Sequence, residues 1–220
     1  DTPYWTNREV LRVEHLPQSL IVLGGGAIGV ELAQALARFG VEVSVIEAAD
    51  RLLALEEPES SALITDVLAA EGVRIRTGAQ VGSVTCDDGI FRLGLGQEEI
   101  TAEQLLVAAG RRPNLPDIGL DTVGLDPRAR SIQVDDHLRA GEKLWAIGDI
   151  TGHGAFTHMS MYQAAIAAAD ILGQPGPGAD YRAVSRVTFT DPEVGSVGMT
   201  EREARAAGLT VQVAITDLAT

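Results

Sequence analysis

A short glycine-rich segment has the composition and spacing of a diphosphate-binding turn. Its pattern is G-x-G-x-x-G, and its residues are Gly24, Gly25, Gly26, Ala27, Ile28 and Gly29. In such a turn Gly24 permits a tight bend, Gly26 lets a pyrophosphate approach the backbone, and Gly29 lets the following helix pack on the preceding strand. The free N–H groups and the positive dipole end of that helix would face the diphosphate. We predict dinucleotide binding here, and a packing turn without a ligand is the alternative.

An acidic residue lies where a dinucleotide site needs one. Glu47 ends a β-rich run at 42–47, 23 residues after Gly24. A carboxylate at this position can accept hydrogen bonds from a ribose 2′-hydroxyl, and it repels the 2′-phosphate of NADP. Arg51 could act as a counter-charge, although pairing with Asp50 or solvent is our interpretation of it. NAD is therefore favoured over NADP.

The elements around this turn predict a parallel sheet. Apolar runs indicate strands at 19–23, 42–47 and 73–76, while helical spacing indicates one helix from 27 to 39 and another from Pro58 to Gly72. The order β-α-β-α-β requires right-handed crossovers and parallel strands. We therefore predict an α/β fold with a Rossmann-like parallel sheet that binds the nicotinamide dinucleotide.

After residue 77 the hydrophobic pattern changes from alternating strands and helices to short strands with polar and apolar residues in alternation. Period-two alternation at 81–85, 90–95 and 97–100 predicts a β-meander, and residues 105–108 form another buried strand. A loop at 113–130 then precedes strands at 131–134 and 144–147, a helix at 159–172 and a linker at 173–179. The last predicted elements are strands at 184–189, 194–197 and 210–215, and a helix at 200–207 capped by Thr200 with Glu203.

Composition excludes several kinds of partner. The 220 residues contain 17 Lys+Arg against 31 Asp+Glu, a net charge of −14. The densest basic clusters are Arg111-Arg112 and Arg128 with Arg130, so we expect neither nucleic-acid nor membrane partners.

The single cysteine, Cys86, is compatible with a reducing cytosol, which predicts a cytoplasmic protein. The first residue is not Met, and we interpret the chain as an internal portion of a longer polypeptide.

Five segments together resemble a known family. They are GGGAIGVELAQALARFG (24–40), LLVAAGRRPNL (105–115), LWAIGDITG (144–152), FTHMSMYQAAIAA (156–168) and VTFTDPEVGSVGMTEREA (187–204). In this order they are similar to segments of the FAD-dependent pyridine nucleotide–disulfide oxidoreductases, the family of dihydrolipoamide dehydrogenase and mercuric reductase. The resemblance spans nearly the whole chain.

The resemblance implies a flavin site. Asp149 would accept hydrogen bonds from the ribityl hydroxyls of FAD, whereas a solvated turn Asp is the alternative. The backbone groups of four residues would lie near the isoalloxazine ring, namely Ala155, Phe156, Thr157 and His158. We interpret His158 as a position close to the cofactor and not as a proton carrier.

It also implies three further positions near the cofactors. Glu31 would lie near the flavin and the nicotinamide, with a solvated helix face as the alternative. Val81 would pack on the adenine, and Gly110 would lie where a strand end approaches the nicotinamide nucleotide.

The domain prediction follows the same resemblance. Residues 1–17 would end a first FAD-domain segment, 18–138 would form the NAD(P)-binding domain, and 139–177 would return to the FAD domain. Residues 178–220 would begin an α+β interface domain, which predicts a homodimer for the full-length protein.

The implied function is electron transfer between a nicotinamide dinucleotide, FAD and a disulfide or thiol-bound substrate. The family's redox-active C-x4-C pair and its His-Glu relay are not present in this chain, so we assign no catalytic residue and no metal site and expect the piece alone to be inactive. Cys86 is expected to be inert, because Asp87 and Asp88 beside it disfavour a thiolate. The alternatives are an NADH oxidase or ferredoxin reductase-like flavoprotein without a redox disulfide, and a non-catalytic NAD-binding module.

Overall fold

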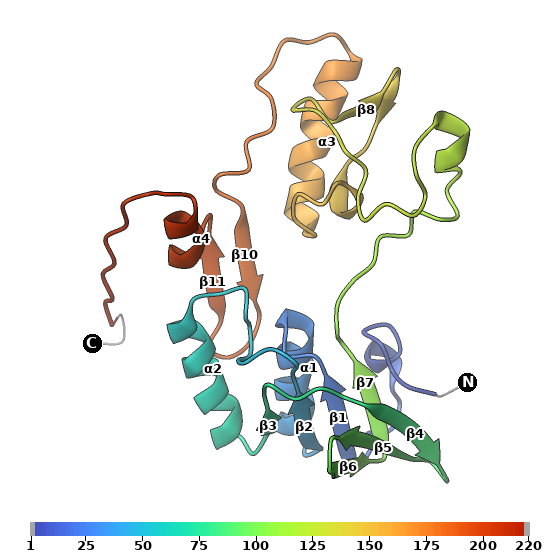
Figure 1. The fold of residues 1–220 in the computed structure, drawn as a ribbon, viewed down its shortest axis with the longest axis vertical. Coiled ribbons are helices and arrows are strands. Elements are labelled where there is room, and N and C mark those ends of the chain that lie inside the picture. Colours follow the sequence, from blue (N-terminus) through green and yellow to red (C-terminus); the bar gives the residue numbers. More distant parts are fainter. Residues whose placement is uncertain (1–2, 218–220) are drawn as a thin grey trace. The chain divides into compact units, whose positions relative to one another are not determined.

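The structure, a computed structural model, describes residues 3–217. The chain divides into two compact units (Figure 1). The first unit comprises the described parts of Asp1–Gly110, Val187–Ser196 and Gln212–Thr220, and the second comprises Arg111–Arg186 and Val197–Val211. Each unit is described by itself below.

The first unit is built on a parallel sheet of four strands. Their order is β3-β2-β1-β7, and they span Ser19–Leu23 (β1), Glu42–Ile46 (β2), Arg74–Arg76 (β3) and Gln104–Val107 (β7). In the register of the central strand, Val22 is paired with Val45 of β2 and Leu106 of β7. Helices α1 (Ala27–Arg38) and α2 (Pro58–Ala70) make the two crossovers. The predicted β-α-β-α-β order and parallel sheet are confirmed.

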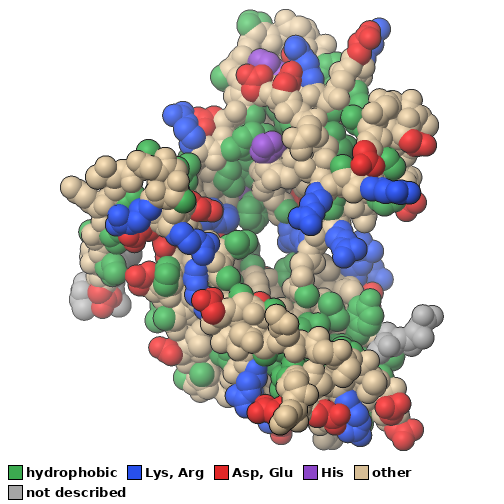
Figure 2. Space-filling view, viewed as in Figure 1, with side chains coloured by type: hydrophobic (Ala, Val, Ile, Leu, Met, Phe, Trp, Pro, Cys, Tyr) green, Lys and Arg blue, Asp and Glu red, His purple; other side chains and the backbone are tan. Residues whose placement is uncertain are grey.

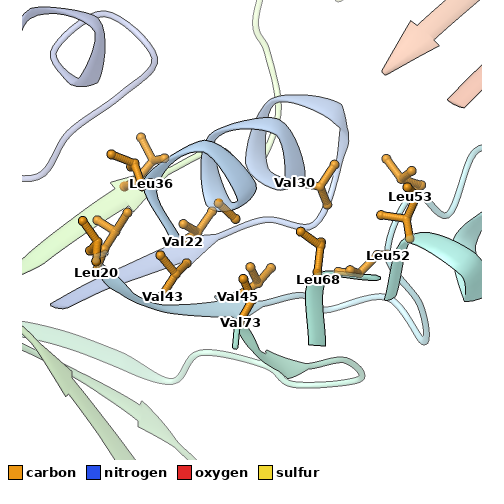
Figure 3. Close-up of a cluster of buried hydrophobic side chains, with 14 of the residues drawn as sticks. Leu20, Val22, Val30, Leu36, Val43, Val45, Leu52, Leu53, Leu68 and Val73 are labelled. Atoms are coloured by element: carbon orange, nitrogen blue, oxygen red, sulfur yellow. The ribbon is translucent and has the colours of Figure 1, made fainter. Parts of the chain in front are cut away.

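Both faces of this sheet are covered. On β1, Leu20 and Val22 join a buried cluster with residues of α1 and α2, such as Val30 and Leu68 (Figure 3). The intervening Ile21 belongs to a second cluster on the other face. Because neighbouring side chains of a strand point to opposite faces, a strand buried on both sides appears in the sequence as an unbroken apolar run.

An antiparallel meander supplies that second face. Its strands are β4 (Ser83–Asp87), β5 (Ile90–Leu95) and β6 (Glu98–Ala102), in the order β4-β5-β6. Phe91 and Leu93 of β5 are buried against Ile21 and Ile46 of the parallel sheet. The predicted meander is therefore present, and it packs against the sheet face opposite α1 and α2.

The second unit centres on helix α3. Its elements are η2 (Leu120–Val123), β8 (Arg139–Gly141), β9 (Leu144–Trp145), η3 (Gly148–Thr151), α3 (Thr157–Ile171) and α4 (Glu201–Ala206). Short strands β10 (Ser185–Thr188) and β11 (Val194–Val197) pair with each other, and most of the segment that contains them, Val187–Ser196, belongs to the first unit. The short helix η1 (Val10–Arg12) also lies in the first unit. Helix α4 begins with the predicted capping box, in which Thr200 and Glu203 bond each other's backbone N–H.

A carboxylate near the end of α3, that of Asp170, forms hydrogen bonds with both strands of the β8–β9 hairpin. Asp170, whose side chain is 9% exposed, accepts hydrogen bonds from both Nε and Nη2 of Arg139. Trp145 Nε1 donates to the same carboxylate at 2.8 Å. The Arg139 guanidinium, with help from Trp145, lowers the pKa of Asp170 below its ordinary value of 3.8.

The stability contributed by Asp170 should depend on pH. A carboxyl whose pKa is lowered by folding stabilises the protein above its unfolded pKa, and that stability is lost as pH falls through the folded pKa. We expect Asp170→Asn to lower Tm by several degrees at pH 7, and the difference from wild type to shrink below about pH 4. Thermal unfolding between neutral and acidic pH measures this. The exposed Asp66 of α2 offers the control Asp66→Asn, and an equal Tm difference at every pH would contradict the assignment.

Two predicted strands are wrong. Residues 131–134 form no strand, because Ile132 is buried in a small cluster and its N–H makes a single bond to the Ile150 carbonyl. Residues 210–215 alternate as a strand would, yet within the described chain they have no partner strand, and Val213 and Ile215 are exposed. A strand needs a hydrogen-bonded neighbour, which the alternation alone cannot supply.

The predicted domain boundaries at residues 17, 138 and 177 remain predictions, because the division into compact units follows contacts within the chain and not the cofactors. Within residues 3–217, none of the helices has the length and apolar character needed to cross a bilayer.

Candidate functional site

The glycine-rich turn connects β1 to α1 in a strained path that requires glycine. Gly24 has φ of +115°, and a Cβ built on it would lie 2.5 Å from the Ala108 carbonyl oxygen. Its N–H donates to the Ile46 carbonyl at 2.8 Å. The turn therefore lies against the chain at the ends of both neighbouring strands, β2 and β7. This is the carboxyl edge of a parallel sheet, where ligands of such folds bind.

The other two glycines of the pattern have different surroundings. A Cβ on Gly29 would lie 1.9 Å from the Gly24 carbonyl oxygen, so Gly29 allows the helix to approach the turn. A Cβ on Gly26 would meet no atom within 4 Å. Gly26 is the N-cap of α1, and no described side chain caps this helix, so its first N–H groups, including those of Ala27 and Ile28, have no partner within the helix. These features fit a diphosphate.

Glu47 reaches the same turn from the end of β2. Its Oε2 accepts a hydrogen bond from Gly25 N at 2.5 Å, and its Oε1 accepts one from Ala49 N at 2.7 Å. The structure thus brings the glycine turn and Glu47 together. Arg51 does not pair with Asp50 as expected; its guanidinium donates instead to the backbone carbonyls of Ala54 and Glu56. Backbone carbonyls hold this guanidinium in place of a carboxylate partner.

In the second unit, Asp149 is presented by the short helix η3. Its side chain is exposed and makes no hydrogen bond with any residue from 3 to 217. The helix η3 is fixed by Gln163 of α3, whose side chain is fully buried. Gly148 N donates to Gln163 Oε1 at 2.6 Å, and Gln163 Nε2 donates to Thr151 Oγ1 at 3.2 Å. The Asp149 carboxylate is therefore free to accept hydrogen bonds while its backbone is fixed.

The residues predicted beside the flavin ring begin α3. The Ala155 carbonyl accepts a hydrogen bond from Arg111 Nη1 at 2.8 Å. Phe156 is the N-cap of α3 and stacks on the His158 ring with centroids 5.3 Å apart, while Thr157, the first residue of the helix, is exposed. His158 Nε2 lies 3.1 Å from the Ser185 carbonyl oxygen. The imidazole is thus held by packing and hydrogen bonding, which agrees with a positional interpretation.

The remaining predicted residues lie in the first unit. Glu31 Oε1 accepts a hydrogen bond from Phe189 N at 2.8 Å, so this carboxylate holds the segment around Phe189. Val81 packs, partly buried, against the cluster that contains Phe91. Gly110 follows β7 with φ of +132°. The nicotinamide-side residues therefore belong to the first unit, and the flavin-side residues belong to the second. Their cofactor roles remain predictions.

Comparison with known proteins identifies the family. Residues 2–169 match the profile described as pyridine nucleotide-disulphide oxidoreductase, and residues 184–220 match the dimerisation domain of the same name. The chain belongs to the pyridine nucleotide-disulphide oxidoreductase family. The resemblance drawn from the five sequence segments is confirmed.

Several pyridine nucleotide-disulphide oxidoreductases are similar over most of the chain. A mercuric reductase of Streptomyces lividans is 35% identical, with 95% of this chain and 45% of that protein covered. A dihydrolipoyl dehydrogenase of Chlamydia muridarum is 38% identical, with 93% and 44% covered. The chain therefore spans less than half the length of these relatives.

Solved structures support the same assignment. The flavoprotein disulfide reductase RclA of Escherichia coli superposes with a TM-score of 0.87 at 31% identity, covering 96% of this chain and 50% of that one. LpdA of Mycobacterium tuberculosis gives 0.84 at 28% identity, covering 92% and 45%. The predicted fold class is confirmed.

Two groups of residues important to the sites were not predicted. On α1, Gln34 exchanges hydrogen bonds with the backbone of Asp191, and Arg38 bonds both Asp191 and Glu71. Hydrogen bonding from Arg38 lowers the pKa of Glu71. The sequence signal for these contacts is a stripe of polar residues on one side of α1, formed by Glu31, Gln34 and Arg38. Gln34 bonds a segment that lies 157 residues further along the chain. Gln163 was the second omission, and a lone amide within the alanine-rich α3 was its only signal.

Proposed function

We propose that the full-length protein is an FAD-dependent oxidoreductase that passes electrons between a nicotinamide dinucleotide and a disulfide or thiol-bound substrate. Family membership and relatives named dihydrolipoyl dehydrogenase and mercuric reductase support this. The observation that carries the nicotinamide part is the open space over Gly26 beside the uncapped start of α1, next to Glu47. FAD, when bound, supplies the two-electron carrier between the nicotinamide and the disulfide.

On the nicotinamide side, this chain's residues bind and select the dinucleotide. The first N–H groups of α1 bind the diphosphate, and Glu47 accepts hydrogen bonds from the ribose 2′-hydroxyl of NAD. Two backbone N–H groups, those of Gly25 and Ala49, already hold the Glu47 carboxylate at the turn. A 2′-phosphate at this place would meet that charge, so we propose NAD over NADP.

On the flavin side, Asp149 accepts hydrogen bonds from the ribityl hydroxyls, and the start of α3 from Ala155 to His158 lies along the ring. Its freedom from protein partners and its exposure support this role for Asp149. We expect the family's redox cysteine pair and His-Glu relay in the full-length protein, and we assign neither to a residue of this chain. Because residues 184–220 match a dimerisation domain, we also propose a homodimer. The single cysteine is compatible with a reducing compartment, and we propose a cytoplasmic protein.

Flavin reduction tests this proposal. We expect the full-length protein to be yellow, and anaerobic NADH to bleach it at lower concentrations than NADPH. Glu47→Gln removes the charge while it keeps an amide oxygen for the turn, so we expect it to reduce the preference for NADH by about ten-fold or more. Anaerobic titrations followed by flavin absorbance measure both effects.

The matched control is Glu42→Gln, which removes a carboxylate at the exposed start of the same strand and should leave the preference unchanged. A colourless protein that binds NAD would contradict the flavoenzyme proposal and favour a nucleotide-binding module. An unchanged nicotinamide preference in Glu47→Gln would contradict the role of Glu47 alone.

A further inference from the structure

An arginine-lined hollow lies in the second unit, in the loop that runs from the end of β7 to residue 130. Its volume is about 530 Å³. It is lined by Arg111, Arg112, Pro113, Pro116, Pro127, Arg128, Ala129 and Arg130. Figure 2 shows Lys and Arg side chains gathered near the loop that follows β7. Four arginines therefore line one hollow whose lining includes no acidic residue, in a chain with a net charge of −14.

Three of these four arginines have no side-chain partner among residues 3–217. Within the described residues, the side chains of Arg112, Arg128 and Arg130 make no hydrogen bond or ion pair, and all three residues are exposed. The carboxylate of Asp126 accepts the backbone N–H of Arg128 and does not hold its side chain. Elsewhere the arginines at 38, 139, 182 and 205 are each paired with a carboxylate. The hollow thus gathers arginines that no carboxylate of residues 3–217 pairs with.

The loop that carries these charges is held in place. Pro113, Pro116 and Pro127 each fix one backbone φ angle in its lining. Leu115 and Leu120 are buried in a cluster with Ile132, which anchors the loop between the two arginine pairs. Arginines on an anchored loop lose less freedom on binding than arginines on a free one, so their affinity for an anion is greater.

We propose that this hollow is a binding site for a small, multiply charged anion of the phosphate class. Guanidinium groups bind phosphate oxygens through paired N–H donors, and four of them suit an anion with several phosphoryl groups. The volume is in the range of small-molecule sites. No aromatic ring lines the hollow to stack on a base, and the acidic chain disfavours a long polyanion, so the ligand is compact.

Arg111 is distinguished from the other three. Its Nη1 already donates to the Ala155 carbonyl at the start of α3, so replacing it would disturb a second structural contact. Arg128 and Arg130 have no such contact, and they form the appropriate pair to change.

Calorimetric titration of the full-length protein with tripolyphosphate at low ionic strength tests the site. We expect Arg128→Gln with Arg130→Gln to weaken binding by about ten-fold or more, because two charge-assisted contacts are lost. The control variant, Arg8→Gln with Arg12→Gln, removes the same charge from two exposed arginines of the first unit and should change affinity less than about two-fold. Citrate, a carboxylate of comparable charge, should bind more weakly than tripolyphosphate.

A measurement without substitutions gives a second readout. Modification of wild-type arginines by phenylglyoxal, mapped by mass spectrometry, should be slowed by tripolyphosphate at Arg112, Arg128 and Arg130 and not at Arg8 or Arg12. Equal tripolyphosphate affinity of the wild type and the Arg128/Arg130 variant would overturn the proposal. Equal weakening in the control variant, equal binding of citrate, or uniform protection of all arginines would also overturn it.

Discussion

Gly26→Val is expected to abolish nicotinamide dinucleotide binding while it leaves the fold intact. Gly26 has φ of −77° and ψ of −177°, which a valine can adopt, and its Cβ would meet no protein atom within 4 Å. The added side chain would instead occupy the space beside the first N–H groups of α1, where we place the diphosphate. Loss of two hydrogen bonds to a charged group corresponds to an increase in Kd of about 100-fold or more.

The contrast with Gly29 makes this prediction specific. A Cβ on Gly29 would lie 1.9 Å from the Gly24 carbonyl oxygen, so Gly29→Ala must displace the backbone of the turn and should lower Tm. Fluorescence titration with NADH and thermal unfolding of both variants separate the two effects. We expect Gly26→Val to keep the wild-type Tm and lose binding. If Gly26→Val binds NADH normally, the diphosphate does not lie at the start of α1.

The parallel sheet could be predicted from sequence because its signals are local. Leu20, Ile21 and Val22 are apolar in succession, since one face of β1 meets α1 and α2 and the other meets the meander. The glycine turn was equally accessible, because the strain at Gly24 and the close approach at Gly29 both arise within a few residues. The position of Glu47 beside the turn could be predicted because it ends the strand that follows the first crossover helix, 23 residues after Gly24.

Features that depend on distant partners could not be predicted. The alternating residues 210–215 resemble a strand but have no partner strand within the described chain. In the sequence, Gln34 and Arg38 are indistinguishable from ordinary polar residues of a helix. Both form hydrogen bonds with Asp191, which lies more than 150 residues further along the chain, so their role depends on the tertiary fold. The hollow between Arg111-Arg112 and Arg128 with Arg130 was visible in the sequence only as two separate basic clusters, which the anchored loop brings together.

The flavin side leads to the second large effect. Asp149→Ala should reduce the FAD bound per polypeptide in the full-length protein about ten-fold or more, because it removes the carboxylate that we propose as the acceptor for the ribityl hydroxyls. Its side chain is exposed and has no partner among residues 3–217, so we expect the Tm of flavin-free protein to stay unchanged. Flavin released by denaturation measures the occupancy. Asp121→Ala, which removes an exposed carboxylate from η2, is the control and should retain full FAD.

Gln163→Leu should separate positioning from direct contact. This amide is fully buried and accepts a hydrogen bond from Gly148 N, so a leucine would leave that N–H unsatisfied and lower the free energy of unfolding by about 1–3 kcal/mol. Thr151 Oγ1 would lose its bond from Gln163 Nε2 but keep its bond to the Gly148 carbonyl. Because the same bonds hold the helix that presents Asp149, FAD affinity should fall together with stability, whereas in Asp149→Ala it falls alone. Apoprotein reconstitution with FAD, measured beside thermal unfolding, distinguishes the two. Full flavin occupancy in Asp149→Ala would show that the carboxylate does not contact the cofactor, whatever the behaviour of Gln163→Leu.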